Sequence, residues 1–457
     1  HEDMAAGYGF DEPSVRLGRP YVDPAAPDTA VDVAIPLRFL NRHGLIAGAT
    51  GTGKTRTLQL MAEQIAAAGS PVFAADMKGD LAGIGAAGAP DERLTARATE
   101  LDYAWSGAAA PVELLTLSGE DGVPLRTSVT EFGPLLLAKV LELNATQESS
   151  LGLIFRFCDQ HELPLLDLED LRAALAYLTG PGKAELKSLG GISSATAGVL
   201  LRKVSQLEAE GGDVFFGEPA FDVGDLLRTA PDGRGIVSVL GLADVARRPA
   251  LFSTFLMWVL AELFEQLPEV GDPERPSLVF FFDEAHLLFD GASKAFLDQV
   301  TQTVRLIRSK GVGVFFITQL PTDVPDDVLS QLGHRVQHAV RAFTPRDARA
   351  LRSAVETFPV AEHYDLAETL RSLGVGEAAV TVLDPRGVPT PVAATRLYPP
   401  ASRMTPLAPE ERAAIISASP LRPRYEERLD RESAAELLEA GPYTHLRAHG
   451  TGRKLVC

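Results

Sequence analysis

The glycine-rich stretch from Arg42 to Thr57, RHGLIAGATGTGKTRT, constrains the fold more than any other part of the chain. Its apolar start, Gly44 to Ala47, predicts a buried strand, and apolar residues at helical spacing in Thr57 to Ala68 predict a helix. A strand, a glycine loop and a helix in this order point successive backbone N–H groups at one spot, which suits the phosphates of a nucleotide. The pattern G-x-x-x-x-G-K-[ST] therefore predicts a P-loop site.

The residues of this loop have distinct expected roles. Lys54 is expected to bridge the β- and γ-phosphates of ATP, and the Thr55 hydroxyl is expected to ligate Mg²⁺. The alternative, a glycine-rich turn beside a surface lysine, is disfavoured because a strand and a helix flank the loop. The residues expected to bind nucleotide form one continuous run: Gly48, Ala49, Thr50, Gly51, Thr52, Gly53, Lys54, Thr55 and Arg56.

The composition is that of a globular chain, with 46% hydrophobic residues among 457, enough for two or three domains. A net charge of −18 disfavours a protein coated in nucleic acid, although a ring or cleft can hide a basic lining inside an acidic exterior. Two cysteines, Cys158 and Cys457, cannot form a disulfide framework, which predicts a cytoplasmic location. The most apolar segment, Ala250 to Leu267, contains glutamates and hydroxyl residues, so it predicts a buried amphipathic helix and no membrane segment.

A second segment supplies acidic groups to the predicted site. Leu278 to Phe282 reads LVFFF, a run that only a strand covered on both faces can bury, and Asp283 and Glu284 follow it. We expect Asp283 to hold Mg²⁺ opposite Thr55, and Glu284 to orient and deprotonate the attacking water. The alternative is a strand that merely ends in acidic residues.

The next predicted strand, Val312 to Thr318, is followed by Gln319. Its amide is expected to reach the γ-phosphate or the attacking water, the alternative being a polar cap on the strand. Arg308, near the end of a predicted helix, is the candidate arginine finger acting at a neighbouring subunit's site. Its alternative role is an exposed cation favoured by the helix dipole. The predicted catalytic residues are thus Glu284, Lys54, Gln319 and Arg308.

Further apolar runs predict more strands in the same sheet. Pro71 to Ala75 and Gly235 to Leu240 are predicted as buried strands, and Arg335 to Phe343 as an outer strand. Val375 to Asp384 and Val388 to Leu397 are predicted to form a terminal hairpin.

Three charged residues, Asp76, Lys78 and Asp80, follow the strand at Pro71 to Ala75. Charged groups at this end of a strand lie where ligands bind in open α/β sheets. A solvated turn is the competing interpretation.

The predicted fold class is α/β, a P-loop fold with a mainly parallel sheet between helices. Within residues 91–230 only Pro111 to Leu117 resembles a strand, and Phe215 and Phe216 are interpreted as a tucked-in turn in preference to a contact surface. The predicted organisation is a segment leading into the sheet (1–40), an ATPase core (41–90 and 231–400), a mostly helical insertion (91–230), a helical tail (401–440) and a non-native, vector-like end (441–457).

Several motifs carry a resemblance to a known family. GATGTGKT, FFFDEAH and the spacing from Arg308 to Gln319 resemble the HerA and FtsK group of P-loop ATPases, ring-shaped motors that pump DNA. ADMKGDLAGI, LEAEGGDVFFGEPA and QLGHRVQHAVRAFTPRD are similar to the bacterial HerA-like branch that includes YjgR. The similarity extends from about Asn41 to Pro399.

This resemblance implies a RecA-like sheet, a homo-oligomer of hexameric form, Mg²⁺-dependent ATP hydrolysis at subunit interfaces, and translocation of DNA. Motif by motif it implies the roles already given for Lys54, Thr55, Asp283, Glu284, Gln319 and Arg308. HerA motors carry an amino-terminal β-barrel for partner docking, whereas only about forty residues precede the glycine loop here. A P-loop ATPase that remodels or tethers proteins, without moving DNA, is therefore the alternative function. A small-molecule kinase is disfavoured because Glu284 suits the activation of water.

Overall fold

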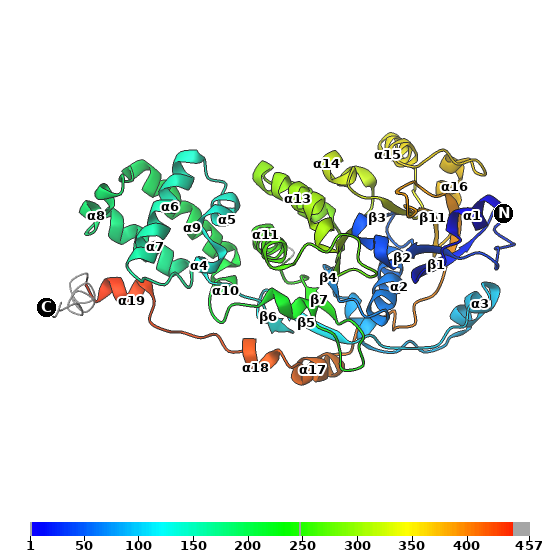
Figure 1. The fold of residues 1–457 in the computed structure, drawn as a ribbon, viewed down its shortest axis with the longest axis horizontal. Coiled ribbons are helices and arrows are strands. Elements are labelled where there is room, and N and C mark those ends of the chain that lie inside the picture. The colour runs from blue at the N-terminus through cyan, green and yellow to red at the C-terminus, as the bar shows by residue number, and fades with distance from the viewer. Residues whose placement is uncertain (1, 246–247, 442–457) are drawn as a thin grey trace.

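The computed structural model describes residues 2–245 and 248–441. Within them the strands form one sheet of twelve, in the order β2-β1-β12-β11-β10-β3-β9-β8-β4-β7-β5-β6 (Figure 1). Pairing is parallel from β10 through to β6 and antiparallel in the remainder, which confirms the predicted α/β class with a mainly parallel sheet. The strands are β1 Ser14–Pro20, β2 Val33–Pro36, β3 Gly44–Ala47, β4 Val72–Asp76, β5 Val112–Thr116, β6 Val123–Pro124, β7 Val237–Gly241, β8 Leu278–Phe282, β9 Val312–Thr318, β10 His334–Gln337, β11 Glu377–Thr381 and β12 Ala393–Leu397.

Helices cover both faces of the parallel part of the sheet, which is why its strands are continuous apolar runs. Phe281 belongs to the apolar cluster that contains α2 (Lys54–Ala67). Phe280 and Phe282 belong to the cluster on the other face, with α11 (Pro249–Gln266) and α13 (Lys294–Ile307). The remaining α-helices of the core are α1 Glu2–Tyr8, α3 Glu92–Glu100, α12 His286–Phe289, α14 Asp326–Leu329, α15 Pro345–Glu356 and α16 Leu366–Ser372.

The strands that flank the glycine loop match their predictions. β3, β8 and β9 have the predicted bounds, and β11 and β12 pair antiparallel as the predicted hairpin. The outer strand predicted at Arg335 to Phe343 is wrong in place and in length. β10 ends at Gln337 and lies inside the sheet, because the hairpin folds back beside it and covers its free edge.

The chain between 91 and 230 divides into two parts, which corrects the prediction of a single insertion. The strand-like stretch at Pro111 to Leu117 forms β5, which pairs with β7 in the main sheet. Residues 129–215 form a separate group of helices at one end of the molecule, the helical lobe (Figure 1). Its helices are α4 Val129–Phe132, α5 Pro134–Val140, α6 Ala145–Gln160, α7 Leu168–Thr179, α8 Lys183–Ser188, α9 Ser194–Leu207 and α10 Asp213–Phe215.

Phe215 and Phe216 are fully buried where the helical lobe joins the sheet, as the tucked-in interpretation predicts. Phe215 packs edge-on against Phe255 and Trp258 of α11, and Phe216 packs edge-on against Phe132. This aromatic group therefore connects the helical lobe to the core.

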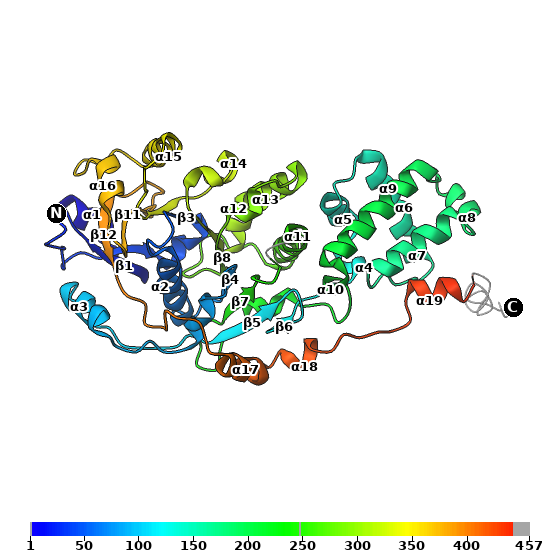
Figure 2. The same ribbon diagram turned by 180° about the vertical axis from the view of Figure 1, so that it is seen from behind.

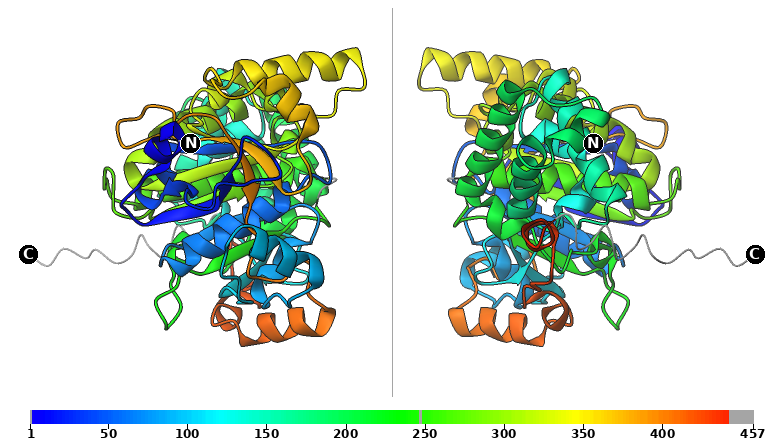
Figure 3. Two further views of the ribbon diagram at one scale, coloured as in Figure 1. Left: turned by 90° about the vertical axis from the view of Figure 1, so that its right-hand side faces the viewer. Right: turned by 90° about the vertical axis from the view of Figure 1, so that its left-hand side faces the viewer.

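Both ends of the described chain run along the core. β1 and β2 extend the sheet beyond β12, so the segment predicted to lead into the sheet contributes two strands to it. The carboxyl-terminal segment carries α17 (Pro409–Ala418), α18 (Arg422–Tyr425) and α19 (Ala434–Glu439), and it runs back from the core to the helical lobe, where α19 packs on α7 (Figure 2). Seen end-on, α17 lies on the opposite side of the molecule from α15 (Figure 3).

Nearly all of the stretch predicted as non-native lies outside the described residues, because these end at residue 441. Cys457 belongs to this stretch. The predicted apolar helix at Ala250 to Leu267 corresponds to α11. None of the helices in the described ranges is both long enough and apolar enough to cross a bilayer.

Candidate active site

The glycine loop leaves β3 at the carboxyl edge of the sheet, between the ends of its two neighbours. The Gly48 N–H donates to the carbonyls of Thr318 and Gln319 at 3.2 and 3.1 Å. Gly51 and Gly53 have φ of 78° and 109°, in the left-handed region that favours glycine. A Cβ on Gly48 would lie 2.5 Å from the Cβ of His338, so a side chain cannot be added at Gly48 without moving this neighbour.

The loop presents backbone donors to one place. The N–H groups of residues 50–55 donate no hydrogen bond to any residue in the described part of the chain. α2 then begins at Lys54, and Gly53 before it supplies no side-chain cap. Free N–H groups at the positive end of a helix form a binding site for an anion such as a phosphate.

Lys54 folds back over this loop. Its Nζ donates to the carbonyls of Gly48 at 2.7 Å and Ala49 at 3.1 Å, and the residue is buried. Burial lowers the pKa of Lys54, while the carboxylates of Glu284 and Asp283 oppose that shift. The ammonium group is thus electrostatically coupled to the acidic pair at the end of β8.

Asp283 is a buried carboxylate with one satisfied oxygen. Its Oδ1 accepts the N–H of Glu284 at 2.9 Å, and its Oδ2 has no hydrogen-bond partner among the described residues. Burial, and then the neighbouring Glu284 carboxylate, raises the pKa of Asp283 to about 7. An unpaired buried carboxylate oxygen is costly unless a cation or donor meets it. Asp283 therefore fits a Mg²⁺ ligand, with the Thr55 hydroxyl on the first turn of α2 as the predicted second ligand.

Glu284 follows in the left-handed conformation, with φ of 50°. This conformation costs a non-glycine residue roughly 1 kcal/mol, and such strain is concentrated at functional sites. Its carboxylate forms an ion pair with Lys78 through Oε1, and its Oε2 lies 3.3 Å from His286 Nδ1. The side chain is only 11% exposed.

Gln319 and Arg308 lie at opposite ends of β9. Gln319 is exposed at the carboxyl end, where its carbonyl accepts the N–H of Gly48. Arg308 precedes the amino end, so the length of the strand separates it from the glycine loop of its own chain. Burial and the nearby Arg42 lower the pKa of Arg308. Within one chain the structure thus groups Gln319 with the loop and leaves Arg308 apart.

His338 contacts the glycine loop and the start of α2, although no role was predicted for it. Its Nε2 lies 2.8 Å from the Thr57 hydroxyl and its Nδ1 lies 3.1 Å from the Thr52 carbonyl. Burial lowers its pKa to about 3, so the ring is neutral. The available signal was the Gln337-His338 pair, two polar residues in succession that interrupt the alternation of apolar and polar residues in the predicted strand.

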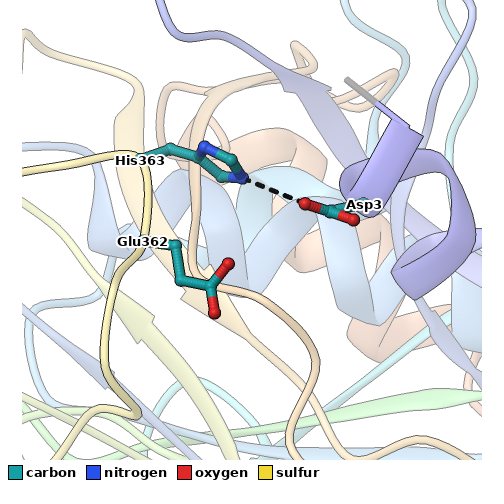
Figure 4. Close-up of side chains that lie close together, drawn as sticks. All are labelled: Asp3, Glu362 and His363. Carbon is teal, nitrogen blue, oxygen red and sulfur yellow. Dashed lines mark ion pairs between the residues drawn. The ribbon is translucent and has the colours of Figure 1, made fainter.

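Among the described residues, one other group could hold a metal ion. Asp3, Glu362 and His363 offer ligand atoms within 4.8 Å of one another, and His363 Nε2 lies 3.6 Å from Asp3 Oδ2 (Figure 4). All three residues are exposed, and they join α1 to the segment before α16. This group is separate from the glycine loop.

Comparisons with known proteins identify the family of the chain. A family model described as "Helicase HerA-like C-terminal" matches residues 24–451. The DNA double-strand break repair helicase HerA of Sulfolobus acidocaldarius is 21% identical over 358 residues, which cover 77% of this chain and 64% of that relative. The chain therefore spans just under two thirds of the length of this relative.

Solved structures share the fold. The bacterial conjugative coupling protein TrwB in its unbound form has a TM-score of 0.55 and 15% identity, covering 89% of this chain and all of that chain. The plasmid coupling protein TrwB in complex with ADP and Mg²⁺ has a TM-score of 0.52 and 16% identity, covering 85% and 97%. Together with the match over most of its length, the glycine loop and the acidic pair show that the chain belongs to the helicase HerA-like C-terminal family of P-loop ATPases.

Proposed function

We propose that this chain binds ATP with Mg²⁺ and hydrolyses it at the carboxyl edge of the sheet. One observation carries the proposal: β3 and β8 both pair parallel with β9, so the glycine loop with Lys54 and the Asp283-Glu284 pair follow strands that end at the same edge, although they are far apart in the sequence. The solved structure of TrwB with ADP and Mg²⁺ supports the choice of nucleotide and metal.

Each residue then has a specific task in hydrolysis. The free N–H groups of the loop and the Lys54 ammonium bind the phosphates, and Asp283 and Thr55 would hold Mg²⁺, which would neutralise phosphate charge. Glu284 accepts a proton from water while the water oxygen forms a bond to the γ-phosphorus. The bond from that phosphorus to the bridging oxygen breaks, and ADP leaves with the electron pair.

We further propose a ring of subunits, most simply a hexamer, in which Arg308 reaches the site of its neighbour. Its place at the far end of β9 supports this arrangement, because Arg308 is apart from the loop of its own chain. DNA is the proposed substrate of the motor, supported by the name of the HerA relative, a DNA double-strand break repair helicase.

ATP turnover measured with and without DNA tests the motor. We expect double-stranded DNA to raise the rate, and we expect this stimulation to decline as salt rises from about 50 to 200 mM because phosphate contacts release counterions. A rate that no form of DNA changes would instead favour an ATPase that remodels or tethers proteins. Light scattering after gel filtration, with and without ATP, tests the ring, and a monomer under both conditions would exclude it.

A further inference from the structure

The turn after β4 is fixed by a buried carboxylate. Asp76 is 1% exposed, and its Oδ1 accepts the N–H groups of Lys78 at 3.2 Å and Gly79 at 2.7 Å. Its Oδ2 accepts the N–H of Leu81 at 3.0 Å. Gly79 has φ of 81°, in the left-handed region. These bonds set the backbone position of Lys78 at the carboxyl edge of the sheet.

The side chain of Lys78 is less constrained by its surroundings than its backbone is. It is 48% exposed, and its one ion pair among the described residues is with the carboxylate of Glu284. Four rotatable carbon bonds allow the ammonium group to leave one partner for another at small cost. The backbone of Lys78 is thus fixed, while its ammonium group can change partners.

In this arrangement Lys78 takes up one of the two Glu284 oxygens that could accept a proton from water. Oε1 is paired with the Lys78 ammonium, and Oε2 faces His286 Nδ1 at 3.3 Å. A general base needs an oxygen within hydrogen-bond reach of the water that it deprotonates. The pair with Lys78 thus withholds Oε1 from water, and departure of Lys78 would make both oxygens of Glu284 available.

Binding of ATP supplies a reason for that movement. Lys54 and Lys78 bring two positive charges to the same edge, where they act on one another and are offset by Asp283 and Glu284. A triphosphate carries more negative charge than the single carboxylate of Glu284, and Coulomb attraction grows with that charge. The terminal phosphate of ATP therefore competes with Glu284 for the ammonium group of Lys78.

We infer that Lys78 is a positioning residue that senses the terminal phosphate: it holds Glu284 inactive in the empty site, and it releases Glu284 when the γ-phosphate of ATP takes its ammonium group. This inference rests on the proposed ATPase function. It makes activation of the base depend on ATP, because ADP lacks the phosphate that Lys78 would bind.

Calorimetric titration of the full chain with ADP and with the β,γ-imido analogue of ATP, both with Mg²⁺, tests this role. Lys78→Met is expected to weaken binding of the imido analogue about tenfold, as expected for the loss of a charged hydrogen bond, with ADP affinity changed less than about twofold. Glu284→Gln removes the competing carboxylate and is expected to tighten the analogue about threefold. That gain should disappear in the double variant Lys78→Met with Glu284→Gln.

Three further measurements separate a sensor from a structural residue. Lys78→Arg should restore most of the preference for the imido analogue, and Lys187→Met, an exposed lysine of the helical lobe, should leave both affinities as they are. In steady-state hydrolysis, Lys78→Met should raise KM for ATP without lowering kcat.

Equal weakening of ADP and the analogue, or a Glu284→Gln gain that survives the loss of Lys78, would overturn the inference. Failure of the ATPase proposal gives a different result, since the wild-type chain would then bind neither nucleotide or would bind ATP without hydrolysing it.

Discussion

The carboxyl edge of the sheet and the helical lobe differ in how particular polar side chains are hydrogen-bonded. At the edge, Asp283 keeps an unpaired buried oxygen and Glu284 is held in a strained conformation. In the lobe, Asn144 caps α6 by accepting the N–H of Gln147 at 2.9 Å, and the buried Asp170 accepts the N–H of Leu166 at 2.8 Å. The unpaired oxygen of Asp283 suits a ligand, whereas the hydrogen bonds of Asn144 and Asp170 stabilise the lobe. Substitutions at the edge should therefore reduce activity, and substitutions in the lobe should reduce stability.

Lys54→Ala should show this difference most strongly. Loss of the ammonium removes the main side-chain contact to the phosphates, so we expect nucleotide binding to disappear in calorimetry and turnover to fall by at least about 10³-fold. The melting temperature without nucleotide should not fall, because the buried ammonium has a lowered pKa and contributes little to folding. A variant that loses activity only because it unfolds would break the comparison.

Arg308→Ala tests whether a residue at the amino edge of the same sheet also contributes to catalysis. We expect turnover to fall about 10³-fold while nucleotide binding is retained, because a finger stabilises only the transition state. Mixing Arg308→Ala with Lys54→Ala subunits should restore part of the rate, since one interface in the mixed ring carries both intact residues. Absence of rescue in an assembled ring would exclude the finger.

A pair of core truncations compares the two regions in stability. Phe281→Ala removes a ring stacked on Phe315 at 5.4 Å inside the sheet, and Leu171→Ala removes a buried side chain of the lobe. Urea unfolding should show a loss of about 3–5 kcal/mol for the first and about 2–5 kcal/mol for the second. Calorimetry should show that, of the two variants, only Leu171→Ala still binds nucleotide. If both variants lose it, the lobe and the site fold as one unit.

The dependence of stability on pH should arise in the core. His43, His334 and His338 are buried beside the sheet, and burial lowers their pKa values from 6.5 to about 4, 4 and 3. Because the unfolded chain binds these protons more readily, their contribution is complete above about pH 6.5 and is lost as pH falls toward 4. Urea unfolding should show a decrease on the order of 1–2 kcal/mol per histidine between pH 6.5 and 5, reduced in His334→Gln. An unchanged free energy of unfolding across this range would contradict the assignment.

The smallest expected effect is in the lobe. Asn144→Ala removes the cap of α6 and should destabilise that helix by about 1 kcal/mol. Hydrogen exchange should speed up within α6, while ATP turnover stays at the wild-type rate. A fall in turnover would show that the lobe communicates with the site.

The sequence allowed the parallel strands and their attached chemistry to be predicted because each strand is an apolar run followed by a functional group. β8 with Asp283 and Glu284, and β9 with Gln319, illustrate this pattern. The position of β10 could not be predicted, because a short strand shows no sign of which neighbours will pair with it. The same limit applies to β5, whose place in the sheet depends on a long-range pairing with β7.

The contacts between side chains from different strands of the site also could not be predicted from the sequence pattern. The pairing of Lys78 with Glu284 joins the ends of two strands, and His338 reaches the loop only because β10 pairs with β3. Such contacts follow from strand order, which local periodicity does not contain.

Hydrolysis and binding measured together on Glu284→Gln test the central claim most directly. The account predicts that this variant binds ATP with Mg²⁺ at least as tightly as the wild-type chain, while its turnover falls by at least about 10²-fold. Wild-type turnover by Glu284→Gln would show that another group activates the water and would contradict the account.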